Sequence, residues 1–374
     1  MTYLSAENPK NLRGKTAIVR VDFNIADKTE TFRLTATLPT IKLLVKHNIN
    51  AILLSHRGKP KNRIENPELR IKASNEDTLR IVLPFLKGHL KRHVRFFNHF
   101  DFLKIKSDID KARPGSIFLL ENVRLFPDEE ENDPALGREL ASLGDFYVND
   151  AFSASHRAHA SITQIPKFLP SFAGLRLEQE LKNLSKVMRS PKKLLIVILG
   201  GAKVSDKIGI IENLSGKADA FLIGGAMANA FLKAKGINIG ASVFEENALP
   251  AAQKLLANEK ILLPADFISH QNRILDIGPL AIEDFSKKIQ SAKTIIWNGP
   301  MGLFENPRFA AGSNAIAKAI ARSHAFSVAG GGETTYLIHE LELEKKFDFL
   351  STGGGAMLKY LSGEKLPGIK ALEN

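Results

Sequence analysis

The sequence predicts an α/β protein built from two doubly wound, Rossmann-like parallel-sheet domains, joined by an interdomain helix and with a cleft between them. Three observations lead to this fold class. Apolar strand-like runs alternate with helix-period segments along the whole chain. The length of 374 residues exceeds what one hydrophobic core normally supports. One long amphipathic segment separates two halves that each carry the alternating pattern.

The predicted strands are short apolar runs spread over the chain. In the first half they cover residues 17–21, 51–54, 94–97, 117–120 and 146–148, and in the second half residues 194–199, 220–223, 260–263, 294–297, 326–329 and 349–350. Helix-period segments lie between them, among others at residues 38–46, 78–90, 134–143, 248–257 and 311–323. Strands that alternate with helices of this length are typical of parallel sheets covered on both faces.

The long segment 175–188 separates the two halves. It ends at Ser190-Pro191, and because proline disfavours helical geometry in the residue before it, this pair predicts a helix end. We interpret the segment as an interdomain helix. The predicted organisation is an N-terminal domain over residues 1–172, a hinge helix over 173–190 and a C-terminal domain over 191–362.

Four predicted strands of the second half run into glycines and then into predicted helices. The glycines are Gly200-Gly201, Gly224-Gly225, Gly330-Gly331-Gly332 and Gly353-Gly354-Gly355. Glycine lets the backbone turn tightly and approach a ligand, and a helix N-terminus adds partial positive charge there. A single turn of this kind is most often only a strand–helix connection. Four of them in one half predict a nucleotide phosphate site.

Basic and hydrogen-bonding side chains follow the predicted strands of the first half instead. They are Asp22, Asn24, Arg33, His56, Arg57, Lys59, Arg124, His156 and Arg157. Ligands of parallel sheets bind at the carboxyl ends of the strands. A single arginine there is more often part of a surface ion pair. Because four strand ends carry Arg or His, the pattern favours a site for a small molecule with carboxylate or phosphate groups.

The composition excludes several function classes. The chain has no cysteine, which rules out disulfides, thiolate metal sites and a cysteine nucleophile. The N-terminus lacks the basic and apolar regions of a signal peptide, and the longest aliphatic run, residues 194–199, is too short to span a bilayer. We therefore expect a soluble cytoplasmic protein with no membrane partner. A P-loop is absent, because Pro9 stands where Gly14-Lys15-Thr16 would require a glycine.

The formal net charge of +12 is compatible with nucleic acid, an anionic small molecule or solubility alone. The most basic stretch, residues 87–95, lies beside Phe96 and Phe97 and superficially resembles a nucleic-acid patch. Its periodicity favours a solvated helix end that leads into a buried strand, so nucleic acid is not the expected partner. His89 and His93 share a helix face but have no third ligand nearby, which disfavours metal binding.

The strand-end motifs resemble those of the phosphoglycerate kinase family in identity and order. In the first half they are Val21-Asp22-Phe23-Asn24, Ser55-His56-Arg57-Gly58-Lys59-Pro60, Leu120-Glu121-Asn122-Val123-Arg124 and residues 150–159. In the second half they are residues 200–207, 276–279, 297–305, 330–334 and 351–355. The resemblance spans the whole chain, including Leu366-Pro367-Gly368, and implies that the tail 363–374 packs back on the N-terminal domain.

The resemblance implies reversible phosphoryl transfer between 1,3-bisphosphoglycerate with ADP and 3-phosphoglycerate with MgATP, in line and after domain closure. The N-terminal domain would bind the glycerate ligand through Asp22, Phe23, Asn24, Arg33, His56, Arg57, Gly58, Lys59, Arg124 and Arg157. The C-terminal domain would bind ATP or ADP through Lys203, Lys207, Asn298, Pro300, Glu305, Gly331, Gly332, Glu333 and Thr334. Glu333 would also hold Mg²⁺ together with the ATP phosphates.

Phosphoryl transfer needs mainly positioning and charge neutralisation. The donors expected at the transferring group are Arg33, Lys207 and the amides of Gly332 and Gly354. Because they come from both predicted domains, the interdomain helix is expected to act as part of a hinge. We expect the enzyme to be a monomer.

The chain departs from the family pattern at three motif positions. Arg57 and Lys59 stand where the family usually has leucine and arginine, and Glu333 stands where it usually has aspartate. Lysine cannot supply the bidentate fork of arginine, which the adjacent Arg57 would have to provide. The stretches 24–33 and 265–275 are also shorter than usual. These departures leave affinity and nucleotide preference open. Two alternatives remain: Lys59 and Glu333 are compatible with a catalytically weakened homologue that acts as a binding or scaffolding protein, and the basic surface is compatible with a nucleic-acid role that could coexist with catalysis.

Overall fold

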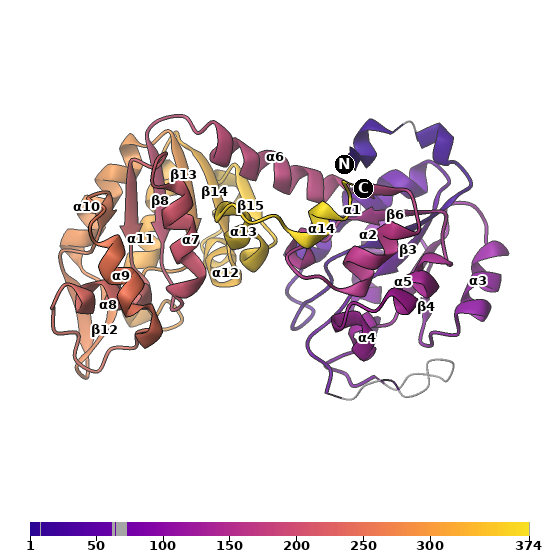
Figure 1. Cartoon of the computed structure of the whole chain (residues 1–374), viewed down its shortest axis with the longest axis horizontal. Coiled ribbons are helices and arrows are strands. Elements are labelled where there is room, and N and C mark those ends of the chain that lie inside the picture. Colours follow the sequence, from indigo (N-terminus) through magenta and orange to yellow (C-terminus); the bar gives the residue numbers. More distant parts are fainter. Residues whose placement is uncertain (8, 62–63, 65–72, 374) are drawn as a thin grey trace. The chain divides into compact units, whose positions relative to one another are not determined.

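The computed structural model describes residues 1–7, 9–61, 64 and 73–373, and the chain divides into two compact units. Unit 1 comprises Met1–Leu181 together with Lys365–Asn374, and unit 2 comprises Lys182–Glu364. Each unit contains a central parallel sheet accompanied by helices (Figure 1). The predicted fold class of two parallel-sheet α/β domains is therefore confirmed.

The sheet of unit 1 has the strand order β1-β7-β6-β2-β3-β5-β4 within the described residues, and every neighbouring pair is parallel. The strands are β1 (Thr2–Tyr3), β2 (Thr16–Arg20), β3 (Asn50–Leu54), β4 (Val94–Phe97), β5 (Ile117–Leu120), β6 (Phe146–Asn149) and β7 (Ser171–Ala173). The predicted strands β2 to β6 are confirmed. β1 and β7 were not predicted, because two or three residues are too few to show a periodicity.

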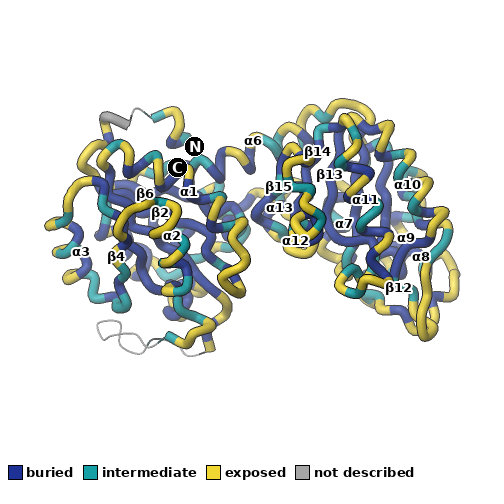
Figure 2. Tube along the Cα trace, turned by 180° about the vertical axis from the view of Figure 1, so that it is seen from behind, coloured by how far each residue is buried: buried dark blue, intermediate teal, exposed yellow. Residues whose placement is uncertain are grey.

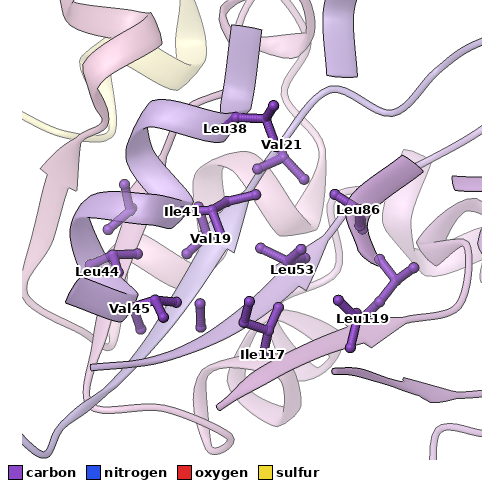
Figure 3. Close-up of a cluster of buried hydrophobic side chains, with 14 of the residues drawn as sticks. Val19, Val21, Leu38, Ile41, Leu44, Val45, Leu53, Leu86, Ile117 and Leu119 are labelled. Atoms are coloured by element: carbon purple, nitrogen blue, oxygen red, sulfur yellow. The ribbon is translucent and has the colours of Figure 1, made fainter. Parts of the chain in front are cut away.

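Helices cover this sheet and bury its strands. They are α1 (Phe32–Lys46), α2 (Leu83–Leu90), α3 (Phe102–Asp110), α4 (Pro127–Glu130) and α5 (Pro134–Ala141). Val19 of β2 and Leu53 of β3 pack with Ile41 and Leu44 of α1 and with Leu86 of α2 in one hydrophobic cluster (Figure 3). β2 and β3 are buried along their whole length, as Figure 2 shows for the sheet interior, because apolar contacts are available on both faces.

The sheet of unit 2 has the strand order β10-β9-β8-β13-β14-β15, again with parallel pairs only. Its strands are β8 (Leu195–Leu199), β9 (Ala220–Ile223), β10 (Ile261–Leu262), β13 (Thr294–Asn298), β14 (Phe326–Gly330) and β15 (Phe349–Ser351), and all six were predicted. This is the order of a Rossmann sheet, in which the topological switch point lies between β8 and β13. A separate antiparallel pair, β11 (Phe267–His270) and β12 (Arg273–Ile277), was not predicted.

Helices follow the glycine turns of unit 2 as predicted. They are α7 (Ser205–Leu214), α8 (Gly225–Ala234), α12 (Gly332–Glu340) and α13 (Gly354–Leu361), and the unit also contains α9 (Leu249–Leu255), α10 (Pro279–Ser291) and α11 (Ala311–Arg322). Phe285 of α10, Ile316 of α11 and Leu337 of α12 belong to one hydrophobic cluster with Trp297 of β13. Helices α3 and α10 had not been predicted. Among the described residues, no helix combines the length and the apolar character that a membrane crossing requires.

The helix α6 (Leu175–Arg189) begins in unit 1 and contains the boundary between the units. Its N-terminus is held by Asp150, the residue after β6. Asp150 Oδ1 accepts from the backbone N–H of Arg176 at 2.8 Å and of Leu177 at 3.3 Å. The hydroxyl of Thr40 accepts from the N–H of Leu175 at 3.0 Å. The first amides of α6, which have no partner inside the helix, are thus bound by the loop after β6 and by α1.

The C-terminal segment packs on unit 1 next to the same strand end. Gly368 N donates to the Ser155 carbonyl at 2.9 Å, and Asn149 Nδ2 donates to the Gly368 carbonyl at 3.4 Å. A Cβ atom on Gly368 would lie 2.7 Å from Ile162 Cγ2, so only glycine fits this approach. Residues 365–374 therefore belong to unit 1.

The buried carboxyl of Asp150 makes a testable contribution to the pH dependence of stability. Burial raises its pKa to about 6, although the bonds from Thr40, Arg176 and Leu177 lower it. Because the unfolded value is about 3.9, the folded state binds the proton more tightly, and stability falls as pH rises through this interval. Asp150→Asn keeps an acceptor for the helix amides but cannot titrate. We expect the free energy of unfolding of Asp150→Asn relative to wild type to rise between pH 4 and pH 7.

Urea unfolding at several pH values measures this difference. As a control for the lost acceptor, Asp150→Ala should be less stable than Asp150→Asn by about 1–2 kcal/mol at every pH. A wild-type minus Asn difference that stays constant from pH 4 to pH 7 would contradict the assignment.

Candidate active site

The carboxyl ends of β2 and β3 bring Asp22, Asn24 and Gly58 together at one edge of the sheet of unit 1. Asp22 Oδ1 accepts from Asn24 N at 3.1 Å, and its Oδ2 accepts from the hydroxyl of Ser153 at 2.5 Å. Asn24 Oδ1 accepts from Gly58 N at 2.8 Å. These bonds fix the loops after the two strands relative to each other without any ligand.

Arg33, in the first turn of α1, belongs to the same group. Its Nη1 donates to the carbonyl of Asn24 at 3.1 Å and lies 3.4 Å from Asp22 Oδ2. The Arg33 side chain is 30% exposed. Solvent therefore screens this ion pair, and a ligand can still reach the guanidinium.

His56, directly after β3, lies among three guanidinium groups. The ring is buried, with its Nδ1 2.9 Å from Nη2 of Arg20. Burial is the main cause that holds the pKa of His56 well below its usual value, followed by the charges of Arg20, Arg124 and Arg157. His56 is therefore neutral at physiological pH. We call His56, Arg20, Arg124 and Arg157 the basic cluster.

Arg124 and Arg157 come to this cluster from two further loops. Arg124 is 2% exposed, and its Nη1 donates to the carbonyl of Gly58 at 2.9 Å. Burial and then the charge of Arg157 lower the pKa of Arg124 to about 10. The pKa of the neighbouring His159 is lowered to about 4, by burial and then by Arg124. Because positive charges held this close repel one another, the cluster favours an anionic ligand.

Two of the predicted glycerate ligands have side chains that point elsewhere. Phe23 is fully buried in the hydrophobic core, so only its backbone is available at this edge. The guanidinium of Arg57 donates at 2.6–2.9 Å to the carbonyls of Ala26, Asn75 and Ile25. Arg57 therefore joins two loops of unit 1, and because all three of its nitrogens already donate there, it cannot present the bidentate fork of an arginine at position 59. Lys59 is exposed.

Ser161 and Glu129 support Arg20 of the basic cluster from inside the unit, and none of these three residues was predicted as a site residue. Arg20 is the last residue of β2 and is fully buried. Its Nε donates to Ser161 Oγ at 2.8 Å, and Ser161 Oγ donates to the buried carboxylate of Glu129 at 2.6 Å. The available signal was an arginine inside an otherwise apolar strand-like run.

In unit 2, the turns after β8, β9 and β13 meet at the topological switch point. Gly201 N donates to the carbonyl of Pro300 at 2.8 Å, and Gly225 N donates to that of Met301 at 2.8 Å. A Cβ on Gly200 would lie 2.0 Å from the Pro300 carbonyl oxygen. The glycines thus allow the backbones of the three turns to pack directly on one another.

Asn298 and Thr334 connect these turns to the next one. Both are buried: Asn298 Nδ2 donates to the carbonyl of Gly330 at 2.7 Å, and Thr334 Oγ1 accepts from Gly299 N at 2.8 Å. Gly331 has a φ of +107°, which favours glycine. Gly354 approaches it closely, since a Cβ on Gly354 would lie 3.1 Å from the Gly331 Cα. The N-termini of α12 and α13 are therefore adjacent.

Lys207 of α7 and Glu333 of α12 flank the first of these turns. Lys207 Nζ and Glu333 Oε2 each lie 3.8 Å from the position that a Cβ on Gly201 would take. Lys207 is 6% exposed, and burial is the main cause that lowers its pKa, against opposing effects of Asp206 and Glu333. A partly desolvated ammonium close to a glycine turn and to the first turn of α12 is suited to a phosphate group.

A pocket of about 250 Å³ lies beside the same turns. Its walls are mainly apolar and include Leu232, Val243, Phe267 and Met301. Of the predicted nucleotide-binding residues, Pro300, Glu305 and Glu333 line the pocket. The other predicted nucleotide-binding residues do not line this pocket; they are Lys203, Lys207, Asn298, Gly331, Gly332 and Thr334. An apolar pocket with a few polar groups at its rim is typical of a small-molecule site.

Comparisons with known proteins agree with this geometry. A family model described as "Phosphoglycerate kinase" matches residues 8–364. The phosphoglycerate kinase of Herpetosiphon aurantiacus is 43% identical over 390 residues, covering 96% of this chain and 97% of the relative. That of Dictyoglomus turgidum is 42% identical, covering 98% and 97%. The chain belongs to the phosphoglycerate kinase family.

Solved structures of the family share the fold. The phosphoglycerate kinase structure from Coxiella burnetii has a TM-score of 0.84 at 34% identity and covers 99% of this chain and 98% of that one. The one from Pyrococcus horikoshii has a TM-score of 0.87 at 30% identity and covers 100% and 98%. The resemblance inferred from the strand-end motifs is thus confirmed at the level of the family.

Members of the phosphoglycerate kinase family use ATP or ADP, typically with Mg²⁺. The side chains around Gly201 can therefore be compared with the ligands that Mg²⁺ requires. Within the described residues there is no group of three or more His, Cys, Asp or Glu side chains that could hold a metal ion. Glu333 offers a single carboxylate beside Lys207. Mg²⁺ is commonly bound by one or two carboxylates, phosphate oxygens and waters. The donor set therefore fits a metal that binds together with the nucleotide phosphates.

The contacts of Arg57 predict a structural role that separates it from the ligand residues. Arg57→Leu restores the usual family residue but leaves several carbonyls without their buried donor. We expect it to lower the free energy of unfolding by about 1–3 kcal/mol. The exposed neighbour supplies the control: Lys59→Leu should change the stability by less than about 0.5 kcal/mol. Denaturant unfolding of both variants is the measurement, and equal stability of Arg57→Leu and wild type would refute the loop-joining role.

Proposed function

We propose that this chain catalyses the reversible transfer of a phosphoryl group between 1,3-bisphosphoglycerate and ADP, giving 3-phosphoglycerate and MgATP. The observation that carries the proposal is the basic cluster at the strand ends of unit 1, in a chain of the phosphoglycerate kinase family. Guanidinium groups that are buried and close together bind a small anion strongly, because charge-assisted hydrogen bonds strengthen when water is excluded.

The acid substrate carries a carboxylate, a hydroxyl and a phosphate, and unit 1 offers matching groups. Arg124, Arg157 and Arg33 supply cationic donors for the two anionic ends, while Asp22 supplies an acceptor for the hydroxyl. The Asp22 carboxylate is held in place by Ser153 and by the backbone of Asn24. In this proposal Arg57 supports the loops, and Phe23 contributes only its backbone.

The nucleotide occupies the switch point of unit 2. Its base and ribose fill the apolar pocket, where Pro300 and Glu305 form part of the wall. Its phosphates follow the glycine turns toward Lys203, Lys207 and the amide ends of α12 and α13. Asn298 and Thr334 contribute by fixing the turns, since both side chains are buried and bonded to backbone groups.

The transfer itself needs no general base. In the direction of ATP use, the bond between the γ-phosphorus and the β-phosphate oxygen breaks, and a bond forms to a carboxylate oxygen of 3-phosphoglycerate. A carboxylate with a pKa near 3.5 is already deprotonated at neutral pH, so no proton has to move. This agrees with the neutral state of His56. When bound, Mg²⁺ neutralises charge on the nucleotide phosphates.

The protein contributes positioning and charge neutralisation of the moving group. Lys207 and the amides of Gly332 and Gly354 act from unit 2, and Arg33 acts from unit 1. Closure of the two units over the substrates stays a prediction. The alternative of a catalytically weakened scaffolding homologue is not favoured, because the family match covers the chain and Lys207 stands beside the glycine turns. A monomer in the cytoplasm remains part of the proposal.

A coupled assay tests the proposed function. Formation of 1,3-bisphosphoglycerate from ATP and 3-phosphoglycerate is followed through its reduction by a dehydrogenase that consumes NADH. We expect turnover that requires both substrates and Mg²⁺. Absence of turnover in a folded sample that still binds ATP and 3-phosphoglycerate would favour the scaffolding alternative instead. For the basic surface, salt-dependent retention on nucleic acid with and without 3-phosphoglycerate decides whether a second role exists.

Lys207 is expected to act mainly in the transition state. Because its ammonium is buried beside the helix N-termini, Lys207→Ala should lower kcat by roughly two orders of magnitude or more, the scale for one lost donor. The dissociation constant for ATP should change less. Lys254→Ala on the exposed face of α9 serves as the control and should leave both values unchanged. A Lys207→Ala variant with a raised KM and an intact kcat would overturn this role.

Glu333 is expected to act through the metal. Its side chain is one methylene longer than the usual aspartate, so it must fold back or reach Mg²⁺ through water. We expect Glu333→Asp to keep or raise activity and to lower the Mg²⁺ concentration for half-maximal rate. Glu333→Ala should raise that concentration and leave 3-phosphoglycerate binding intact.

The competing role of Glu333 is electrostatic support of the α12 N-terminus. In that case the Mg²⁺ titrations of wild type, Glu333→Asp and Glu333→Ala at fixed ATP would coincide, and only thermal stability would differ. Glu340→Gln at the other end of the same helix is the control for a change in surface charge.

A further inference from the structure

The guanidinium of Arg20 uses all three of its nitrogens inside unit 1. Nε donates to Ser161 Oγ at 2.8 Å, Nη1 donates to the carbonyl of Val21 at 2.7 Å, and Nη2 lies 2.9 Å from Nδ1 of His56. Arg20 is fully buried, and His56 is 3% exposed. This contact between an arginine and a histidine ring is therefore shielded from water.

The direction of the hydrogen bond to His56 is fixed by chemistry. A guanidinium has donors only, so Nδ1 of His56 must be the acceptor and carries no proton. A neutral imidazole with an unprotonated Nδ1 carries its proton on Nε2. A doubly protonated ring would turn a donor toward a donor, and Arg124, Arg157 and His159 add to the cost of a charge there.

A chain of buried groups orients Arg20 in turn. Ser161 Oγ accepts from Arg20 and donates to Glu129 Oε1 at 2.6 Å, and Ser161 N donates to Glu129 Oε2 at 2.8 Å. The Tyr147 hydroxyl donates to the Ser161 carbonyl at 2.9 Å. Arg20 thus donates in two directions, to His56 on one side and to Ser161 on the other, and Ser161 donates in turn to the Glu129 carboxylate. Glu129 also compensates the charge of Arg20, whose pKa burial lowers and Glu129 raises.

Nε2 of His56 makes no hydrogen bond within the described part of the chain. His56 follows β3 at the same edge of the sheet as Asp22, Asn24 and Gly58. The single N–H of the neutral ring is therefore on Nε2, the nitrogen that has no hydrogen-bond partner among the described residues. A ring with its donor available can bond an oxygen of a carboxylate or phosphate, whereas the other tautomer would present a lone pair and repel it.

We propose that Arg20 is a positioning residue that fixes His56 as the neutral Nε2–H tautomer, so that His56 acts as a hydrogen-bond donor to the acid substrate. The part that concerns the substrate rests on the proposed function, whereas the tautomer does not. His56 then neither accepts a proton in the reaction nor titrates in the working pH range. Glu129 and Ser161 act through Arg20.

The tautomer is measured directly by long-range ¹H–¹⁵N correlation NMR of the full chain labelled in histidine, with the His56 signals assigned from His56→Gln. The expected spectrum shows an unprotonated Nδ1 and a protonated Nε2, unchanged from pH 5.5 to pH 8.5. A protonated Nδ1, or titration of His56 near neutral pH, would overturn the proposal. This wild-type measurement decides the point even if an Arg20 variant fails to fold.

Two kinds of variant connect the tautomer to substrate binding. Arg20→Met removes the donor to Nδ1, so the Nδ1–H tautomer of His56 should become populated beside the Nε2–H form. It should also raise KM for 3-phosphoglycerate by about 10- to 100-fold with KM for ATP within twofold. Ser161→Ala keeps Arg20 and should have a smaller effect in the same direction. An Arg20→Met variant with unchanged His56 signals and unchanged acid KM contradicts the positioning role.

The substitutions at His56 test the donor itself. A glutamine can accept from Arg20 through its oxygen and donate through its amide nitrogen, so His56→Gln should retain much of the acid affinity. His56→Leu, of similar size but without a donor, should lose about as much as Arg20→Met. Equal affinity of the Gln and Leu variants would reject the donor role. If the wild type shows no turnover at all, the proposed function fails while the NMR result still stands.

Discussion

Burial of one positive charge, that of Arg20, is the constraint around which the acid-facing edge of unit 1 is built. A lone guanidinium inside a protein is costly, and it is stable only when hydrogen bonds and an opposite charge compensate it. Here compensation comes from Ser161, Glu129 and the carbonyl of Val21. The groups that provide it lie on segments far apart in the sequence, so satisfying Arg20 also fixes how these segments meet.

The edge of the sheet in unit 2 that carries the glycine turns is held in place mainly by backbone packing. Its turns carry few side chains, and the backbones of Gly200, Gly201 and Gly225 pack directly against residues 299–301. Where unit 1 presents charged side chains held by buried partners, unit 2 presents backbone amides and one desolvated lysine. Both arrangements suit phosphate chemistry, because each places donors in position before the ligand binds and so reduces reorganisation during transfer.

Much of the fold could be predicted, because alternating apolar runs and helical segments are local properties of the sequence. The eleven strands of the parallel sheets that were expected from such runs are present. Very short strands such as β1 and β7 depend on pairing with a neighbour and leave no local pattern. Helix α3 was missed because residues 102–110 were not separated from the surrounding loop, although Asp101 caps the helix by accepting from Lys104 N.

Site residues were harder to predict than strands, since a motif position does not show where a side chain points. Arg57 stands inside a ligand motif, yet its donors bond to carbonyls of residues 25–26 and 75, and no sequence pattern brings these two loops together. Asn298 and Thr334 likewise support the turns. Arg20 shows the reverse case. It lies in a buried strand and was therefore not predicted as a site residue, although it contacts His56, which the motif did identify.

The loop after β6 links these local arrangements to the rest of unit 1. Asn149 bonds to Gly368 of the C-terminal segment, Asp150 bonds to the first amides of α6, and Ser153 bonds to Asp22. The chain leaves unit 1 through α6 and returns to it through the C-terminal segment. The neighbouring residues Asn149 and Asp150 therefore bond to both of the segments that connect unit 1 to unit 2. Asp22, the C-terminal segment and the start of α6 therefore share one supporting loop, and the same hydrogen bonds that hold the Asp22 carboxylate in place also fix where the chain leaves and re-enters unit 1.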